Sequence, residues 1–534
     1  MELQHISELE RAVEGGRGEL VRFGVSFLFM VCVMFYAASQ EGGRGELVLV
    51  MAAIVATYMA MNIGANDVAN NVGPAVGAKA FSLVGALAIA GLFDIAGALI
   101  AGERVIERMR SGILQPEMVT DPQVFVAIML AALLASAVWV NLASALGAPV
   151  STTHAIVGAV MGGGMAAYGV GVVNWAVMVS IAASWVVSPL LGGVLAAVFL
   201  YLIKRSILYQ VDMSAAARRV VPLLLAGMAW IFTTYLIVEG LSRLHLFSAE
   251  VALGLGFAAA VITYFAVRAR VCDRGRLIPN TRQGVNRLFT IPLMFAAAVM
   301  SFAHGSNDVA NAVGPLAAIV HSLSGDGAVT ANGVLSSMAG GVVPMWVMVV
   351  GALGIAVGLV LFGPRVIRTV GSELTELDHI RAFSVAMASA LTVIVASGFG
   401  LPVSSTHIVV GSVLGVGFLR EYLRSTQDDM LVEIKAHHPA GDQEAIDAFV
   451  ARFMRASIDE KGRLLKELKR QSRTGEDPAR FAKRERKALK RVYRQELVKR
   501  SQLRRIVTAW VVTVPASALM AAMLFHVMRG VLAA

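Results

Sequence analysis

The sequence has few charged residues: Asp, Glu, Lys and Arg make up only 15% of its 534 residues, while 57% are hydrophobic. Soluble proteins carry about 25% charged residues, so this chain lacks the polar surface that keeps a protein in water. It has only two cysteines, Cys32 and Cys272, and no Gly-Lys dipeptide. These absences exclude a disulfide framework, a cysteine metal site and a Walker A loop. The composition instead predicts a polytopic membrane protein that ATP does not drive directly.

The few charges are concentrated near the C-terminus. Residues 421–505 hold 22 Lys and Arg and 14 Asp and Glu, or 36 of the 82 charged residues. We therefore expect a charged helical insert in the cytoplasm. A basic segment beside a membrane follows the positive-inside rule, so the net charge of +10 gives no reason to expect nucleic-acid binding. The acidic first 16 residues are unlike a secretory signal, and residues 22–39 are expected to be a retained membrane anchor.

Crossing a membrane takes about 20 apolar residues in a helix, and many segments approach that length. Some candidates are too long for a simple crossing and others are too short, so simple spans do not account for the whole pattern. The candidate spans are 22–39, 48–77, 83–101, 123–146, 155–170, 174–203, 219–240, 246–267, 288–322, 335–362, 382–400, 408–420 and 506–530.

Two polar strings occur twice within these apolar segments. MNIGANDVANNVGP at 61–74 returns as SFAHGSNDVANAVGP at 301–315, 241 residues later. GAPVSTTHAIVGAVMGGG at 147–164 returns as GLPVSSTHIVVGSVLGVG at 400–417, 253 residues later. Both motifs recur in the same order, so the chain contains an internal repeat.

The loops that are rich in Lys and Arg, 204–219 and 268–287, are expected to be cytoplasmic. Counting crossings from them makes the first copy of each motif enter the membrane from outside and the second from the cytoplasm. We therefore expect an all-α polytopic membrane protein with two inverted-topology repeats, broken helices and re-entrant hairpins, as in secondary transporters. The expected parts are an N-terminal segment with the first membrane helix (1–47), the first transport repeat (48–203), connecting helices and basic cytoplasmic loops (204–287), the second transport repeat (288–420), the charged insert (421–505) and the last membrane helix (506–534).

The first motif places a carboxylate between two amides in each repeat. The residues are Asn66, Asp67 and Asn70, and Asn307, Asp308 and Asn311. A carboxylate inside the bilayer is costly unless it is paired or faces a cavity. Gly64 with Pro74, and Gly305 with Pro315, predict breaks that expose backbone carbonyls, and such oxygens suit a hard cation such as Na⁺. The alternative is that these side chains only hold helices together, but their duplication favours a site.

The second motif predicts an anion site. Its hydroxyl residues are Ser151, Thr152 and Thr153 in the first repeat and Ser404, Ser405 and Thr406 in the second. Pro149 and Pro402 end the incoming helices, so each hydroxyl trio lies at a helix N-terminus, where free N–H groups attract anions. The alternative is that the hydroxyls only cap these helices.

Four further ionisable residues lie in apolar segments. His154, His304 and His407 are expected to be structural hydrogen-bond partners, and we leave them out of the predicted site. Asp94 has no counterpart in the second repeat. Two interpretations of Asp94 are open: a proton-coupling group, or the partner of another polar side chain.

At the duplicated strings GANDVANN with GSNDVANA and PVSTTH with PVSSTH, the chain resembles the PiT family of inorganic phosphate transporters. The resemblance implies phosphate uptake coupled to Na⁺ or H⁺, an inverted repeat with two hairpins, and a homodimer. By this resemblance, phosphate is expected at Asn66, Asp67, Ser151, Thr152, Thr153, Asn307, Asp308, Ser404, Ser405 and Thr406. The cation is expected at Asn66, Asp67, Asn70, Thr153, Asn307, Asp308, Asn311 and Thr406. The position of the insert after the second repeat departs from the family, in which the large loop often lies between the halves.

The sequence thus predicts a phosphate symporter of the plasma (inner) membrane in which cations neutralise Asp67 and Asp308, so that the anion can bind. Its expected partners are phosphate, a monovalent cation, the lipid bilayer and a second copy, with no nucleic acid and no cofactor. A permease for sulfate or another tetrahedral oxyanion is the first alternative, and an anion channel or phosphate-sensing receptor is the second. An enzyme is not expected, because the sequence contains no nucleophile and base arrangement.

Overall fold

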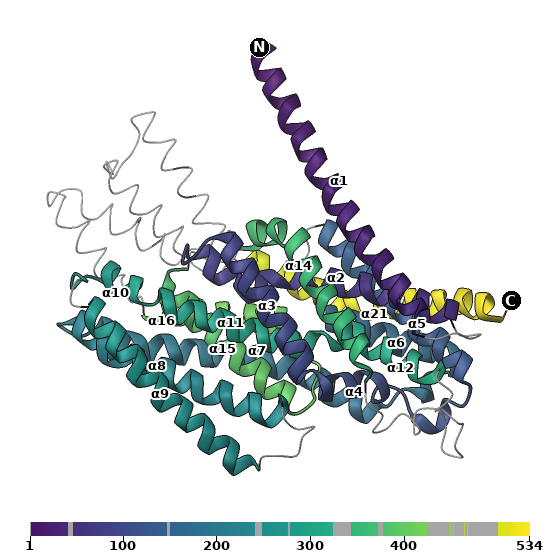
Figure 1. Ribbon diagram of the computed structural model, residues 1–534. Coiled ribbons are helices and arrows are strands. Elements are labelled where there is room, and N and C mark those ends of the chain that lie inside the picture. The colour runs from purple at the N-terminus through teal and green to yellow at the C-terminus, as the bar shows by residue number, and fades with distance from the viewer. Residues whose placement is uncertain are drawn as a thin grey trace. The chain divides into compact units, whose positions relative to one another are not determined.

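The computed structural model describes most of the chain outside the insert (Figure 1). The described residues are 2–40, 46–146, 150–240, 248–275, 278–323, 343–371, 377–423 and 500–533, with the single residues 449, 452, 464 and 467. Pro149 and almost all of the predicted insert lie outside the described residues.

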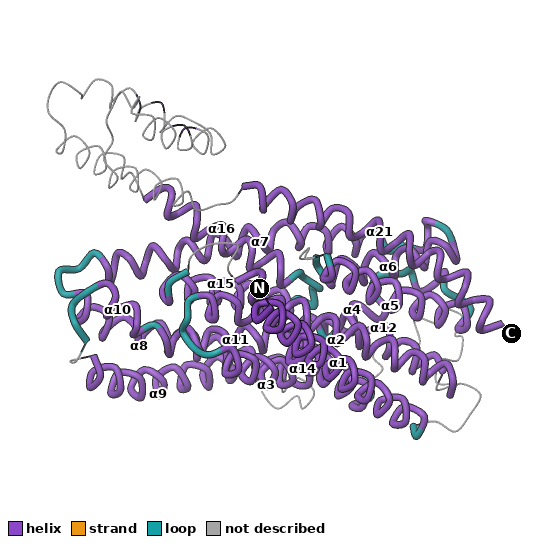
Figure 2. Tube along the Cα trace, turned by 90° about the horizontal axis from the view of Figure 1, so that it is seen from above, coloured by secondary structure: helices purple, strands orange, loops and turns teal. Residues whose placement is uncertain are grey.

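The described chain is helical, with loops and turns between the helices (Figure 2). In the described ranges the only β-type pairing is an isolated bridge between Leu114 and Val173. The elements are α1 (Glu2–Ala38), α2 (Glu46–Gly77), α3 (Leu83–Ala101), α4 (Glu103–Ser111), η1 (Pro116–Met118), α5 (Pro122–Ala145), α6 (Thr152–Tyr168), η2 (Val170–Val172), α7 (Trp175–Ile203), η3 (Lys204–Leu208), α8 (Met213–Tyr235), η4 (Leu236–Gly240), α9 (Ala249–Gly275), α10 (Arg282–Leu288), α11 (Thr290–Asp308), α12 (Ala310–Leu323), α14 (Met345–Gly371), α15 (His379–Gly398), α16 (Ser405–Leu423) and α21 (Arg500–Ala533).

Ten helices among the described residues are long and apolar enough to cross a membrane, or eleven if α10 and the bent segment that follows it form one span. Their outer faces carry large apolar side chains, such as Phe257, Ile262 and Phe265 of α9, which are more than half exposed. Lipid is the solvent that such faces require, and helices satisfy their own backbone groups within it. The expectation of an all-α, multi-pass integral membrane protein is confirmed.

The chain forms two compact units, residues 1–415 with 504–534, and residues 416–503. All polar residues of the duplicated motifs belong to the first unit. Within it, α5 and α6 pack together as the first hairpin. We call α15 and the first turns of α16 the second hairpin, since Ser389 of α15 donates a hydrogen bond to Ser412 of α16.

The helices that carry the Asn-Asp motifs are α2 in the first repeat and α11 with α12 in the second. α2 packs closely against α14, because a Cβ added at Gly64 would overlap the carbonyl oxygen of Ile355. The contact is reciprocal, since a Cβ at Gly358 would overlap the carbonyl oxygen of Met61. Small residues commonly allow this backbone approach between membrane helices.

α11 packs against α3 in the same way. A Cβ at Gly305 would overlap the carbonyl oxygen of Asp94, and one at Gly97 would overlap that of Phe302. Gly305 and Phe302 of α11 lie 241 residues after Gly64 and Met61 of α2, so the contacts are at equivalent positions of the repeat. Each motif helix therefore packs against the helix that follows the motif in the other repeat.

The helices that begin at the hydroxyl trios also pack closely against helices outside their own repeat. In α6, a Cβ at Gly162 would overlap the backbone of Ala518 in α21. In α16, a Cβ at Gly415 would overlap the backbone of Gly193 in α7. The two repeats are thus interlocked within the first unit.

A row of four aromatic rings connects α6, α7, α16 and α21. His154 contacts Trp185 of α7 at a centroid distance of 3.8 Å, and His407 stacks on Trp510 of α21 at 3.5 Å. The two histidines contact each other edge to face at 4.4 Å. Trp185 also donates a hydrogen bond of 3.2 Å to the carbonyl of Pro402. These histidines join the two hairpins by packing.

The helix break predicted at Gly64 and Pro74 is wrong. α2 runs continuously from Glu46 to Gly77 with Pro74 inside it. Gly64 is required for the close contact with α14 rather than for a bend, and Pro74 lies so near the end of α2 that few later hydrogen bonds depend on it. In the second repeat the interruption falls at Val309, between α11 and α12.

The glycine crossings predict a selective loss of stability. Gly305→Ala should lower the thermal unfolding midpoint of the purified protein in detergent, because overpacking of a tight contact costs about 1–3 kcal/mol or more. Gly91→Ala in α3 is the matched control, since nothing lies within 4 Å of a Cβ at that position. Equal midpoints for the two variants would show that the α3 and α11 contact is not tight.

Candidate functional site

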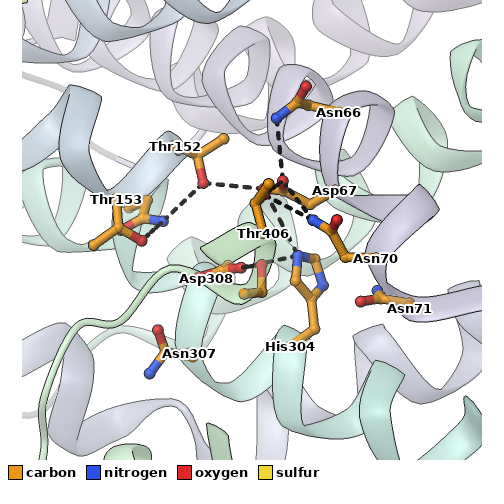
Figure 3. Close-up of polar contacts among 12 residues, drawn as sticks. Asn66, Asp67, Asn70, Asn71, Thr152, Thr153, His304, Asn307, Asp308 and Thr406 are labelled. Atoms are coloured by element: carbon orange, nitrogen blue, oxygen red, sulfur yellow. Dashed lines mark hydrogen bonds and ion pairs between the residues drawn. The ribbon is translucent and has the colours of Figure 1, made fainter. Parts of the chain in front are cut away.

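Asp67 lies at the centre of a buried polar network (Figure 3). Its Oδ1 accepts hydrogen bonds from the amides of Asn66 and Asn70 at 3.1 Å and from the hydroxyl of Thr406 at 3.0 Å. Its Oδ2 accepts one from Thr152 at 3.0 Å. Thr152 begins α6 and Thr406 lies in the first turn of α16, so both hairpins meet at one carboxylate.

Asp308 has a different environment, although it occupies the equivalent position. Its Oδ2 accepts a hydrogen bond of 2.8 Å from Ser405 and lies 3.0 Å from Nε2 of His304. Its Oδ1 is buried and has no hydrogen-bond partner among the described residues. The two aspartates are therefore not equally satisfied.

The second amide of each motif reaches the hairpin of the other repeat. Asn70 donates a hydrogen bond of 2.8 Å to Thr406. Asn311 donates to Thr153 at 3.1 Å and to Thr152 at 3.4 Å. Thr153 in turn donates to the carbonyl of Val403 at 2.9 Å. The exchange between repeats therefore extends to the polar contacts.

The first amide of each motif holds the hairpin of its own repeat. Asn66 donates to the carbonyl of Val150 at 3.0 Å. Asn307 donates to the carbonyl of Leu401 at 3.1 Å and accepts from the amide of Val403 at 3.2 Å. Figure 3 shows Asn307 pointing away from the contacts around Asp67. Asn307 thus anchors the connector before α16.

The first hydroxyl of each trio caps its helix. Ser151 accepts a hydrogen bond of 3.1 Å from the backbone N–H of His154. Ser404 accepts one of 3.3 Å from the N–H of His407. The capping interpretation therefore describes Ser151 and Ser404, while Thr152, Ser405 and Thr406 contact the aspartates.

His304 belongs to the polar network, although its sequence context predicts only a structural hydrogen-bonding role. It is fully buried, and its Nδ1 lies 3.0 Å from Oδ1 of Asp94. Its Nε2 faces Asp308 at 3.0 Å and Asp67 at 3.9 Å. The signal that could have found it is its spacing of four residues before Asp308, which puts both on one helix face.

Asp94 has partners, as one of its two interpretations required. Besides His304, it accepts hydrogen bonds of 3.3 Å from the Nδ2 of Asn71 at both carboxylate oxygens. Its role in proton coupling stays a prediction. Asp67, His304 and Asp308 each offer a ligand atom, and these atoms lie within 4.8 Å of one another, so these three residues could hold a cation.

Comparison with known proteins identifies the fold that carries this site. The sequence profile of the phosphate transporter family matches residues 63–521. The chain belongs to this family. A Helicobacter pylori (strain J99) protein named "Putative phosphate permease" is 47% identical over 531 residues, which cover 98% of each chain. A Chlamydia trachomatis protein of the same name is 41% identical over 396 residues, which cover 70% of this chain and 90% of the relative.

A solved structure is also similar. "The sodium-dependent phosphate transporter" matches with a TM-score of 0.71 and 30% identity, covering 91% of this chain and 100% of that chain. The resemblance found at the duplicated motifs is confirmed, and the family is one of transporters. The roles of the individual site residues remain predictions.

The network around Asp67 predicts that Thr406 affects phosphate binding. Thr406→Val removes a donor to the carboxylate and leaves the Asn70 amide with one acceptor fewer. Thr406 is also one of the predicted phosphate ligands, and a hydrogen bond to a charged group contributes about 1.5–3 kcal/mol. We therefore expect at least tenfold weaker stabilisation by phosphate in a thermal-shift titration. Thr392→Val is the matched control, since its buried hydroxyl donates only to the backbone of Ala388. A Thr406→Val titration that matches the wild type would contradict this role.

Proposed function

We propose that this protein is a secondary active symporter that imports inorganic phosphate with Na⁺. The observation that carries the proposal is that one buried carboxylate, Asp67, accepts hydrogen bonds from Thr152 of one hairpin and Thr406 of the other. Membership of the phosphate transporter family supports the substrate. The similar solved structure, described as sodium-dependent, supports Na⁺ over H⁺.

The coupling follows from competition for hydroxyl donors. Thr152, Ser405 and Thr406 donate to aspartates, so their protons are not free to bind an anion. A cation at the carboxylates takes up the oxygen lone pairs and cancels the negative charge that repels phosphate. The released hydroxyls then turn to the oxygens of phosphate. Cation binding therefore precedes anion binding, and neither solute is carried efficiently alone.

We propose the same ligand sets that the sequence predicts. Phosphate is bound by the threonines and serines of the two trios with the Asn-Asp pairs, and the cation by the same pairs with Asn70, Asn311, Thr153 and Thr406. Ser151 and Ser404 contribute through the helix ends that they cap. Backbone N–H groups at those ends favour an anion.

The transport cycle requires access from each side in turn. We propose that the two repeats have inverted topology, that the site lies near the middle of the plasma (inner) membrane, and that the protein works as a homodimer. We also propose that the chain is divided into two transport repeats, the connecting helices between them, the charged insert and the last membrane helix. Inverted repeats allow alternating access by movement of one element against the other around a fixed site.

Reconstituted transport separates the possible coupling ions. Proteoliposomes with an inward Na⁺ gradient at equal pH should accumulate labelled phosphate above its external concentration, and a pH gradient without Na⁺ should not drive uptake. Excess sulfate should not compete if phosphate is the substrate. Uptake driven by a pH gradient alone would make H⁺ the coupling ion. Uptake that never exceeds the external concentration would indicate a channel.

The two aspartates should be essential for coupling. Asp67→Asn and Asp308→Asn keep the side-chain size but remove the charge that a cation neutralises, so Na⁺-driven uptake should fall at least a hundredfold in each. Asp121→Asn is the matched control, because Asp121 caps α5 outside the network and Asn caps a helix equally well. Normal Na⁺-dependent uptake by Asp67→Asn would refute the proposed coupling.

A further inference from the structure

Three ligand atoms of different residues converge beside Asp67. The Nε2 of His304 lies 3.0 Å from Oδ2 of Asp308 and 3.9 Å from Oδ2 of Asp67. A metal ion bound tetrahedrally at about 2.0–2.2 Å has ligand atoms roughly 3.3–3.6 Å apart. The two distances lie on either side of that range. All three ligand atoms lie within 4.8 Å of one another, so movements of the side chains can place them around one ion.

His304 is oriented as a metal-ligating histidine is. Its Nδ1 contacts the carboxylate of Asp94, which the amide of Asn71 holds in turn. A carboxylate on one ring nitrogen fixes the proton there and leaves the other nitrogen as a basic lone pair. That nitrogen, Nε2, points at the two aspartates of the proposed cation site.

One atom in this cluster is left without a partner. Oδ1 of Asp308 is buried and has no hydrogen-bond partner among the described residues, whereas Nε2 of His304 faces Oδ2 of the same aspartate at 3.0 Å. A buried polar atom without a partner costs about 1–3 kcal/mol. A cation held by this carboxylate would satisfy that oxygen.

The histidine and its carboxylate occur at only one of the two equivalent helix crossings, that of α3 and α11. The residue equivalent to His304 in the first motif is Ile63. The residue equivalent to Asp94 is Ile355, since each packs its carbonyl against the glycine of a motif helix. A Na⁺ site needs oxygen ligands, and the Asn-Asp motifs supply these in both repeats. The imidazole is thus an addition to the duplicated set, and imidazole favours Zn²⁺ and related transition metals.

We propose that Asp67, His304 and Asp308 form a binding site for a divalent transition-metal ion of the Zn²⁺ class, with Asp94 as the residue that positions the imidazole. The inference rests on the proposed function in one respect: the same two aspartates bind the coupling cation. A bound divalent ion therefore competes with Na⁺ and inhibits Na⁺-driven uptake. Metal binding itself requires neither phosphate nor a gradient.

Titration of the purified full-length protein with Co²⁺ tests the site directly. Co²⁺ should give visible absorption bands that Zn²⁺ displaces. His304→Gln should weaken Co²⁺ binding at least tenfold, and Asp94→Asn about 10–100-fold, as expected for a residue that orients a ligand. His526→Gln, which removes an exposed histidine of α21, should leave the affinity unchanged. A His304→Gln protein that binds Co²⁺ as the wild type does overturns the proposal.

Measuring Na⁺-driven phosphate uptake in the presence of Zn²⁺ distinguishes failure of the metal site from failure of the proposed symport. In the wild type, Zn²⁺ should raise the Na⁺ concentration needed for half-maximal uptake, and Asp94→Asn should need at least tenfold more Zn²⁺ for the same effect. If the protein shows no Na⁺-driven uptake but still binds Co²⁺ in a way that depends on His304, the symport is refuted and the metal site is supported. If His304→Gln does not fold, wild-type Co²⁺ affinity in Asp94→Asn overturns the metal site.

Discussion

The structure depends on one carboxylate that must be buried in an apolar environment. Asp67 can be ionised there only if hydrogen-bond donors replace the water that it has lost. The two amides of its own helix supply part of this requirement, and the hydroxyls of Thr152 and Thr406 supply the rest. Because those threonines start two different helices, satisfying Asp67 fixes where both hairpins end. The fold around the site is therefore set by the same contacts that the proposed coupling has to break.

The two halves are alike in packing but differ in chemistry. Reciprocal glycine contacts place α2 on α14 and α11 on α3, so the backbones follow one design. Within that design, Ile63 and Ile355 of one crossing are replaced by His304 and Asp94 in the other. Asp67 consequently has four donors, while Asp308 shares its surroundings with an imidazole. The duplicated scaffold thus carries a site with two unequal positions.

Duplication also explains what the sequence could predict. The motifs predicted that Asp67, Asp308 and the hydroxyl trios form one site, and the structure brings Thr152, Ser405 and Thr406 to the aspartates. His304 was missed because a search for repeated residues overlooks a residue that occurs in one repeat only. The continuity of α2 through Gly64 was missed because a glycine that permits close packing has the same sequence signature as one that permits a bend. Such distinctions depend on which helix lies opposite, and a single sequence does not reveal that.

The exchange of helices between the repeats has a consequence for how the protein is made. When the ribosome has completed only the first repeat, Gly64 has no α14 to pack against, and Asp67 lacks the hydroxyl of Thr406. The first half thus remains an incomplete structure in the membrane until the second half has been inserted. The two halves of the chain therefore depend on each other for their close backbone contacts and for the donors around the buried carboxylate.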